Sequence, residues 1–155
     1  MRTVFMIALL AACGGSQSTE PTTTTTTGSA AGSATSLYAS LGGEPAIKAV
    51  VKDFVEEQVN KDPRINAQFT NADVPGLERK LYEQICSAAG GGCTYTGKDM
   101  KTAHANMKIT EADFNALVED LVKSLDKFHV KDADKQALLG VLGPMKPDIV
   151  TVHTP

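Results

Sequence analysis

The chain has 155 residues, of which 42% are hydrophobic, and its formal net charge is −3. This length is sufficient for one domain with a substantial core. The slightly acidic balance and the lack of any Lys/Arg cluster argue against a nucleic-acid-binding face, and the absence of Trp argues against a base-stacking platform.

The first twelve residues have the pattern of a targeting segment. Arg2 precedes an apolar stretch, Val4 to Ala12, that is too short for the roughly twenty residues of a membrane-spanning helix. The stretch ends in Leu-Ala-Ala-Cys at Cys13, which resembles the lipobox of bacterial lipoproteins. In that family the chain is cut before the Cys and the sulfur receives a diacylglyceryl group. The resemblance implies a signal peptide at 1–12 and lipidation of Cys13; an ordinary signal peptide or a buried Cys is the alternative.

Residues 13–35 have the composition of a tether. Six consecutive Thr, from Thr22 to Thr27, lie among Ser, Gly, Ala and Pro, with Glu20 as the single charge. Such a segment lacks the apolar residues that offset the entropy of ordering, so we expect it to be disordered and to span roughly 25–30 Å. The residue after the Cys is Gly14 rather than Asp. In a Gram-negative bacterium this favours a location in the outer membrane. We therefore expect a domain at 36–152 that is lipid-anchored in the cell envelope.

From residue 36 onward the sequence predicts an all-α domain, because no segment shows sustained strand alternation. Gly90 to Gly92 should end the second helix, and Thr110 with Asp113 resembles a capping box at the start of the third. Pro144 is expected to kink the fourth helix. Apolar residues recur at helical spacing in four stretches, near 46–55, 75–88, 111–128 and 132–149.

The stretch between the second and third helices is polar and short. It runs from Tyr95 to Met107 and has room for one or two helical turns. Met100 and His104 are four residues apart, so their side chains would leave the same face of such a turn.

Several motifs, in this order and spacing, resemble those of group 1 truncated haemoglobins. The resemblance covers about 115 residues, 36–150, and implies a truncated globin-like 2-on-2 helical sandwich around a haem. The alignment needs one extra residue between Phe54 and Asp62. The motifs are Ser36-Leu-Tyr-Ala-Ser-Leu-Gly-Gly43, Asp53-Phe54, Asp62-Pro-Arg-Ile65, Phe69, Gly90-Gly91, Tyr95-Thr-Gly97, Met100 with His104, and Leu139-Gly-Val-Leu-Gly-Pro-Met145.

The resemblance implies that His104 is the proximal iron ligand and that Met100 lies flat against the porphyrin. A neutral imidazole binds iron through one ring nitrogen while the other hydrogen-bonds to the backbone. Without the family pattern, a single His would be read as an ordinary surface or core residue. No Cys-x-x-Cys-His occurs, so we expect haem b to be held non-covalently. Further haem contacts are expected from Phe54, Phe69, Leu77, Leu81, Tyr95, Phe114 and Val118.

The predicted ligand pocket on the distal side of the haem departs from the family pattern. Many members carry Tyr directly after the Phe of the second helix, where this chain has Val55. The two inward positions of the next helix are Leu77 and Leu81, so none of the three side chains donates a hydrogen bond. Lys80 and Gln84 flank the same face and complete the predicted pocket.

Cys86 and Cys93 are the remaining thiols. Outside the cytoplasm an even pair suggests a disulfide, and the three glycines between them allow the chain to reverse. Closing this eight-residue loop would stabilise the fold by about 2.5 kcal/mol on the chain-entropy account. Two unpaired, half-buried Cys residues are the alternative.

The leading functional prediction is reversible binding of oxygen, CO or NO at the haem iron, as in an oxygen carrier rather than an enzyme. A nitric-oxide dioxygenase or peroxidase is the first alternative, although the apolar pocket argues against it. A haem-based redox or gas sensor and a haem-free binding module are the others. The sequence identifies no redox partner.

Overall fold

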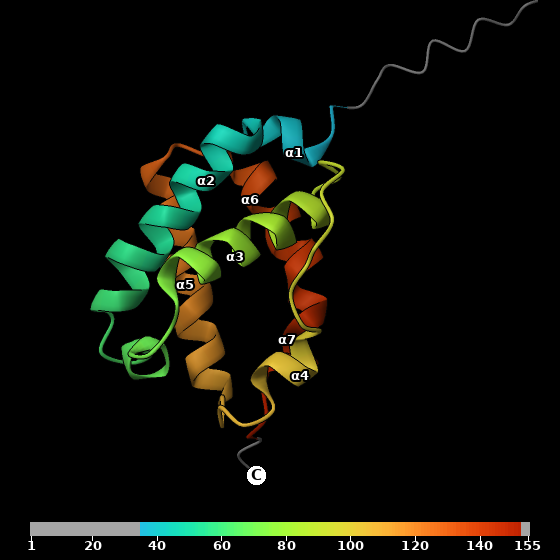
Figure 1. Ribbon diagram of the computed structural model, residues 1–155. Helices are drawn as coiled ribbons and strands as arrows, with labels where there is room; N and C mark the ends of the chain where they lie inside the picture. The colour runs from blue at the N-terminus through green and yellow to red at the C-terminus, as the bar shows by residue number, and fades with distance from the viewer. Residues whose placement is uncertain (1–34, 153–155) are drawn as a thin grey trace, which may run out of the picture. The chain divides into compact units, whose positions relative to one another are not determined.

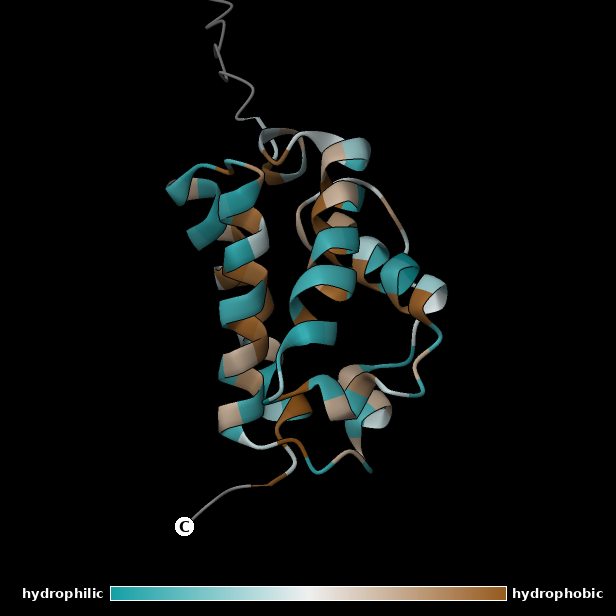
Figure 2. Ribbon diagram, turned by 90° about the vertical axis from the view of Figure 1, so that its left-hand side faces the viewer, coloured by the Kyte–Doolittle hydropathy of each residue, from teal (hydrophilic) through white to brown (hydrophobic). Residues whose placement is uncertain are grey.

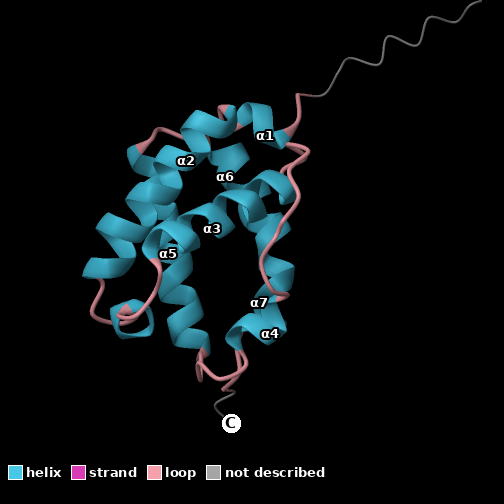
Figure 3. Cartoon of the chain, viewed as in Figure 1, coloured by secondary structure: helices cyan, strands magenta, loops and turns pink. Residues whose placement is uncertain are grey.

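The computed structural model describes residues 35–152 of the chain, and nearly all of them lie in helices or the loops between them (Figures 1 and 3). Within this range β pairing is limited to one isolated bridge, between Thr110 and Val152. The predicted all-α fold is therefore confirmed. The predicted signal peptide, the lipidated Cys13 and nearly all of the tether lie outside the described residues.

The described range contains seven α-helices and four π- or 3₁₀-helical turns. None of its helices is both long enough and apolar enough to cross a membrane. The α-helices are α1 Leu37–Ser40, α2 Gly43–Asp53, α3 Val74–Ala88, α4 Met100–His104, α5 Glu111–Lys127, α6 Asp132–Leu142 and α7 Lys146–Ile149. The turns are a π-helix, η1 Phe54–Gln58, and three 3₁₀ helices, η2 Val59–Lys61, η3 Asn66–Phe69 and η4 Gly143–Met145.

The ends of the later helices follow local chemistry. At the start of α5, the Asp113 N–H donates to Thr110 Oγ1 at 3.1 Å, and the Thr110 N–H donates to the Asp113 carboxylate at 2.9 Å. This reciprocal pair is the predicted capping box. The fourth predicted helix is divided into α6 and α7 by the 3₁₀ turn η4 that contains Pro144, because proline has no N–H to continue an α-helix.

The core lies between α2, α3 and α5. The helix α2 packs against α3, η1 packs against α5, and α4 lies beside α7 (Figure 1). The longer helices carry apolar and polar residues on different sides, as their periodicity predicted (Figure 2). The largest fully buried aliphatic side chains are Val51, Val55, Val59, Leu125 and Leu138.

A π-helical turn follows α2 directly and lies in the stretch between Phe54 and Asp62 where the alignment needs one extra residue. A π-turn adds one residue to a helix without opening a loop. Both Phe54 and Val55 stay buried in the turn, at 5% and 1% exposure. The insertion therefore leaves the apolar character of this position intact.

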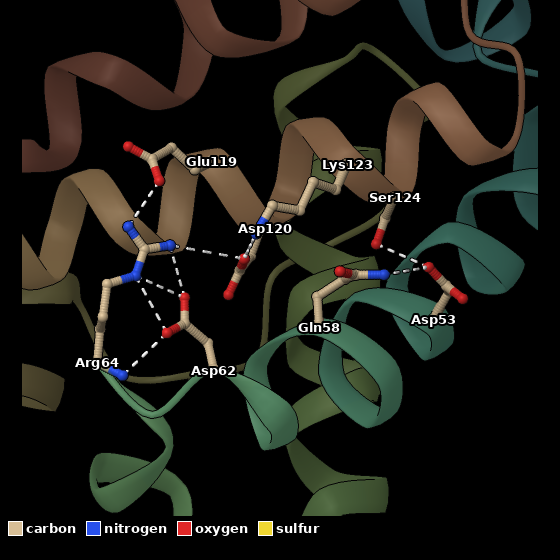
Figure 4. A network of polar contacts seen from close by, with 8 residues as sticks. All are labelled: Asp53, Gln58, Asp62, Arg64, Glu119, Asp120, Lys123 and Ser124. Carbon is tan, nitrogen blue, oxygen red and sulfur yellow. Dashed lines mark hydrogen bonds and ion pairs between the residues drawn. The ribbon is translucent and has the colours of Figure 1, made fainter.

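Buried carboxylates fasten the end of α2 to α5 (Figure 4). Asp53 accepts a hydrogen bond from Ser124 Oγ at 2.9 Å, and Lys127 pairs with the same carboxylate. Burial opposes ionisation of Asp53, but the hydrogen bonds from Lys127 and Ser124 outweigh it and lower the pKa of Asp53. The charge is therefore retained inside the fold by donors from a helix that is distant in sequence.

The loop after η2 is fastened to α5 by Arg64. Its guanidinium donates to Asp62 at 2.6 Å and to Glu119 on α5 at 2.7 Å (Figure 4). The hydrogen bonds from Arg64 lower the pKa of Asp62 to about 2. Beside them Lys123 donates to the buried Asp120 at 2.7 Å.

We expect Asp62 to stabilise the fold at neutral pH but not in strong acid. Its pKa falls from 3.8 to about 2 on folding, so the folded state favours the ionised form. The contribution is complete above the unfolded pKa and is lost as the pH falls through the folded value. In urea unfolding of the wild type and Asp62→Asn, the difference in unfolding free energy should be constant above about pH 5 and shrink toward pH 2. A difference that is the same at pH 2 and pH 7 would contradict this assignment.

A disulfide joins Cys86, in the last part of α3, to Cys93 in the following loop, with 5.7 Å between the Cα atoms. Gly90 and Gly92 have positive φ, and the Gly91 N–H donates to the Cys86 carbonyl at 2.8 Å. A Cβ at Gly91 would lie 2.4 Å from the Tyr38 ring. The glycines therefore permit the reversal that brings the two sulfurs together.

Candidate functional site

The short helix α4 presents His104 to a pocket. Asp99 caps its N-terminus by accepting from the Thr102 N–H at 2.9 Å, and the helix has five residues, as the one or two predicted turns require. His104 Nδ1 lies 2.8 Å from the carbonyl oxygen of Met100. Because a carbonyl oxygen only accepts, this bond assigns the proton to Nδ1 and leaves the Nε2 lone pair free to bind a metal.

The pocket beside His104 is walled mainly by apolar side chains. Its polar members besides His104 are Gln68 and Asp113, and the Asp113 carboxylate already accepts from Thr110. The lining residues are Ile65, Gln68, Phe69, His104, Met107, Ile109, Asp113, Phe114, Leu117 and Ile149.

The structure brings three of the predicted site residues, Phe69, His104 and Phe114, into this one pocket. Met100 is half-buried one turn before His104, and Val118 is half-buried on α5. Tyr95 is also half-buried, and its hydroxyl donates to the Lys98 carbonyl at 3.0 Å.

Sequence reasoning did not assign several residues of the pocket lining to the site. Leu117 lies one turn after Phe114 on the apolar stripe of α5, so helical spacing could have identified it. Ile149 reaches the pocket because α7 packs beside α4, and Ile65 reaches it from the loop before η3. No local pattern marks these last two positions.

The residues predicted for the distal side lie outside the lining of this pocket. Val55 is buried in the core, while Leu77 and Leu81 are half-buried on α3 and pack against the core. Lys80 Nζ binds Thr96 Oγ1 and lies 3.5 Å from Glu83. Gln84 Nε2 is 3.2 Å from Met145 Sδ, and its Oε1 is buried without a partner. Their roles toward a bound ligand stay predictions.

The residues of the pocket fit a haem. Across residues 35–152 no three His, Cys, Asp or Glu side chains gather as metal ligands. A porphyrin supplies four nitrogens itself, so one imidazole with a free nitrogen completes its proximal side. Phe69 and Phe114 provide aromatic walls for a flat apolar ring.

Known proteins share this fold and much of the sequence. Residues 36–151 match the family described as bacterial-like globin. The chain is 31% identical over 116 residues to a group 1 truncated haemoglobin of Mycolicibacterium paratuberculosis, covering 75% of this chain and 85% of that protein. It is 30% identical over 119 residues to one of Chlamydomonas moewusii, covering 76% and 69%.

Solved structures of truncated haemoglobins are also similar to this chain in fold. The Fe(III) form of truncated haemoglobin from Tetrahymena pyriformis superposes with a TM-score of 0.71 at 30% identity, covering 74% of this chain and 97% of that one. The 2/2 haemoglobin of Synechococcus sp. PCC 7002, in the cyanomet state with covalently attached haem, has a TM-score of 0.70 at 28% identity, covering 76% and 99%.

The helical fold, the histidine in an apolar pocket and the matches to known globins together identify the class of protein as a haem-binding globin. The chain belongs to the bacterial-like globin family, and the resemblance to truncated haemoglobins is confirmed. The 2-on-2 fold, the haem b cofactor and the binding of diatomic ligands follow from that membership.

Proposed function

We propose that this protein is a lipid-anchored truncated haemoglobin of the bacterial cell envelope that reversibly binds oxygen or another diatomic ligand at an iron held by His104. Haem b supplies the iron that takes the ligand. The observation that carries the proposal is the 2.8 Å contact between His104 Nδ1 and the Met100 carbonyl. It fixes the ring and leaves one nitrogen for the metal, as in metal-binding histidines whose other ring nitrogen is hydrogen-bonded.

The apolar side chains that line the pocket with His104 contribute to haem binding in a different way. Phe69, Phe114 and Leu117 offer apolar surface on the same pocket as His104. Burial of a large apolar ring against such surface contributes about 25 cal/mol for each Å² removed from water. These residues therefore hold a non-covalent haem and exclude water from its proximal side.

The predicted distal residues favour ligand binding over enzymatic turnover. Val55, Leu77 and Leu81 donate no side-chain hydrogen bond. Nitric-oxide dioxygenation needs oxygen to be stabilised and an electron donor to be present. Without a donor at these predicted distal positions, we expect rapid and reversible exchange of the ligand.

Absorption spectra of the purified protein test this function. We expect a Soret band that shifts on reduction and again on addition of CO, and an oxygen complex that forms and dissociates as oxygen is admitted and removed. Catalytic consumption of nitric oxide without reversible oxygen binding would instead support the dioxygenase alternative. A protein purified with haem added during expression and still lacking a Soret band would overturn the proposal.

The proposed location rests on two features. The Leu-Ala-Ala-Cys sequence ending at Cys13 is followed by a segment with the composition of a tether. The disulfide between Cys86 and Cys93 is of a kind that persists outside the cytoplasm and is rare inside it. Both fit a globin held at the outside of a bacterial membrane.

We predict that Cys13→Ser moves the protein from the membrane fraction to the soluble fraction of the expressing bacterium. A Ser hydroxyl does not take the place of the thiol in lipidation, whereas the distant globin domain should keep its haem spectrum. Ser16→Ala, three residues further on, is the matched control and should stay with the membrane. If Cys13→Ser remains membrane-bound after a high-salt wash, the anchor lies elsewhere.

A further inference from the structure

The helix that carries the proximal histidine has little packing of its own. The helix α4 has five residues, none of them buried, and its main packing partner is α7. A helix this short is not stable by itself in water. Contacts outside the helix must therefore fix its position, and one set of them comes from α3.

Glu83 on α3 holds the loop that leads into α4. Its side chain is 15% exposed, and its Oε2 accepts from the Thr96 N–H at 2.9 Å and from Thr96 Oγ1 at 2.7 Å. Lys80 Nζ lies 3.5 Å from the same oxygen. The hydrogen bonds from Thr96 hold the pKa of Glu83 below its usual range, so the carboxylate is ionised at neutral pH. We refer to Glu83 and Thr96 together as the loop clamp.

The loop between the clamp and His104 is short and internally braced. The Tyr95 hydroxyl donates to the Lys98 carbonyl at 3.0 Å. The ring of Tyr95 lies so close to Gly97 that a Cβ there would be 2.1 Å from the Tyr95 hydroxyl oxygen. Asp99 then caps α4 through the Thr102 N–H. Each step from Thr96 to the start of α4 is thus fixed by a named contact.

We infer that Glu83 is a positioning residue for the proximal iron ligand: by fixing Thr96 to α3, it sets the place and orientation of α4 and therefore of the His104 ring. The disulfide fixes the beginning of the same loop at Cys93. At the other end of the loop, α7 packs against α4. The clamp supplies the attachment between them. The inference rests on the assignment of His104 as the iron ligand.

The test uses the full-length holoprotein and two variants of the clamp. Glu83→Ala removes both hydrogen bonds of the clamp. Thr96→Val keeps the shape of the side chain and the backbone bond to Glu83, but removes the hydroxyl and its contacts with Glu83 and Lys80. Thr96→Ser keeps the hydroxyl and is the conservative control. Glu78→Ala is the second control, because Glu78 is a half-buried carboxylate on the same helix with one oxygen that has no partner.

Two measurements separate positioning from general stability. The iron–histidine stretching band in the resonance Raman spectrum of the ferrous protein reports on the His104 ring, and transfer of haem to an apo-globin acceptor reports on retention. We expect both clamp variants to shift or split the band. We also expect them to lose haem about tenfold faster, because losing a hydrogen bond to a charged group typically weakens an equilibrium by about that factor and weaker haem binding should appear as faster release. Thr96→Ser and Glu78→Ala should keep the wild-type band.

The outcomes are distinct. An unchanged band in both Glu83→Ala and Thr96→Val, with or without faster haem loss, overturns the inference, and so does an equal shift in either control. If Glu83→Ala does not fold, the comparison of Thr96→Val with Thr96→Ser decides. His104→Gly distinguishes failure of the ligand assignment: a wild-type band in that variant means that His104 is not the ligand, whereas loss of the band there beside unchanged clamp variants overturns the clamp alone.

Discussion

Replacing His104 with Gly is expected to abolish stable haem binding, and added imidazole is expected to restore it. The imidazole nitrogen left free by the Met100 contact is the one imidazole ligand that this pocket offers. Losing a partner that only orients a metal ligand costs about 10–100-fold in affinity, so losing the ligand itself should cost more. Haem transfer to an apo-globin acceptor measures the loss, and the Soret band after imidazole addition measures the rescue.

His129→Asn is the matched control for this experiment. His129 is exposed at the end of α5 and has a φ of +56°, a conformation that Asn tolerates better than most residues. This variant should retain haem and show the wild-type spectrum. A His104→Gly protein that keeps both the wild-type spectrum and the wild-type rate of haem loss would refute the assignment of the proximal ligand.

Placing Tyr at Val55 is expected to slow oxygen release by about ten- to a hundredfold. The distal residues predicted from the sequence offer no donor, and a hydrogen bond to a ligand with negative charge is worth about 1.5–3 kcal/mol. The unmodified protein should therefore release oxygen quickly and oxidise readily, whereas CO, which depends less on such a bond, should bind well. Stopped-flow replacement of oxygen by CO measures the release rate.

Val55→Phe separates hydrogen bonding from packing. Val55 is 1% exposed, so any larger ring must repack its surroundings, at a typical cost of about 1–3 kcal/mol. Phe brings that cost without the hydroxyl and should leave oxygen release fast. Slow release from the unmodified protein that neither Lys80→Ala nor Gln84→Ala changes would show that the distal pocket has been assigned wrongly. Lys80 and Gln84, on the same helix as Leu77 and Leu81, carry the side-chain donors of the predicted pocket.

Much of the fold was predictable because helix faces and helix ends depend on residues close together in sequence. The capping box at Thr110 needs a partner three residues away. The contact of His104 with Met100 spans one helical turn, so its spacing could be read before the structure was known. The turn at Gly90 to Gly92 follows from the positive φ that glycine tolerates.

The prediction that the protein binds haem came from the family pattern. The periodicity of the apolar residues did not indicate any cofactor. A single histidine in a polar stretch has many uses, and only the order of the motifs around it indicated iron. The extra residue after Phe54 was visible as an alignment gap. The π-helical turn in this stretch, with Val55 still buried, could not be predicted from the pattern of apolar residues.

The sequence by itself determined which segments are helical and where most of them end, because each depends on side chains within about one turn of one another. The prediction of His104 as the iron ligand came from the order of the family motifs along the chain. The tertiary structure alone decided that Ile149 shares a pocket with His104, that Asp53 is bound by Ser124, and that Glu83 holds Thr96. These contacts join helices or loops that are packed together from different parts of the chain. Their partners are selected by how the helices pack, and packing is a property of the whole fold that no local pattern records.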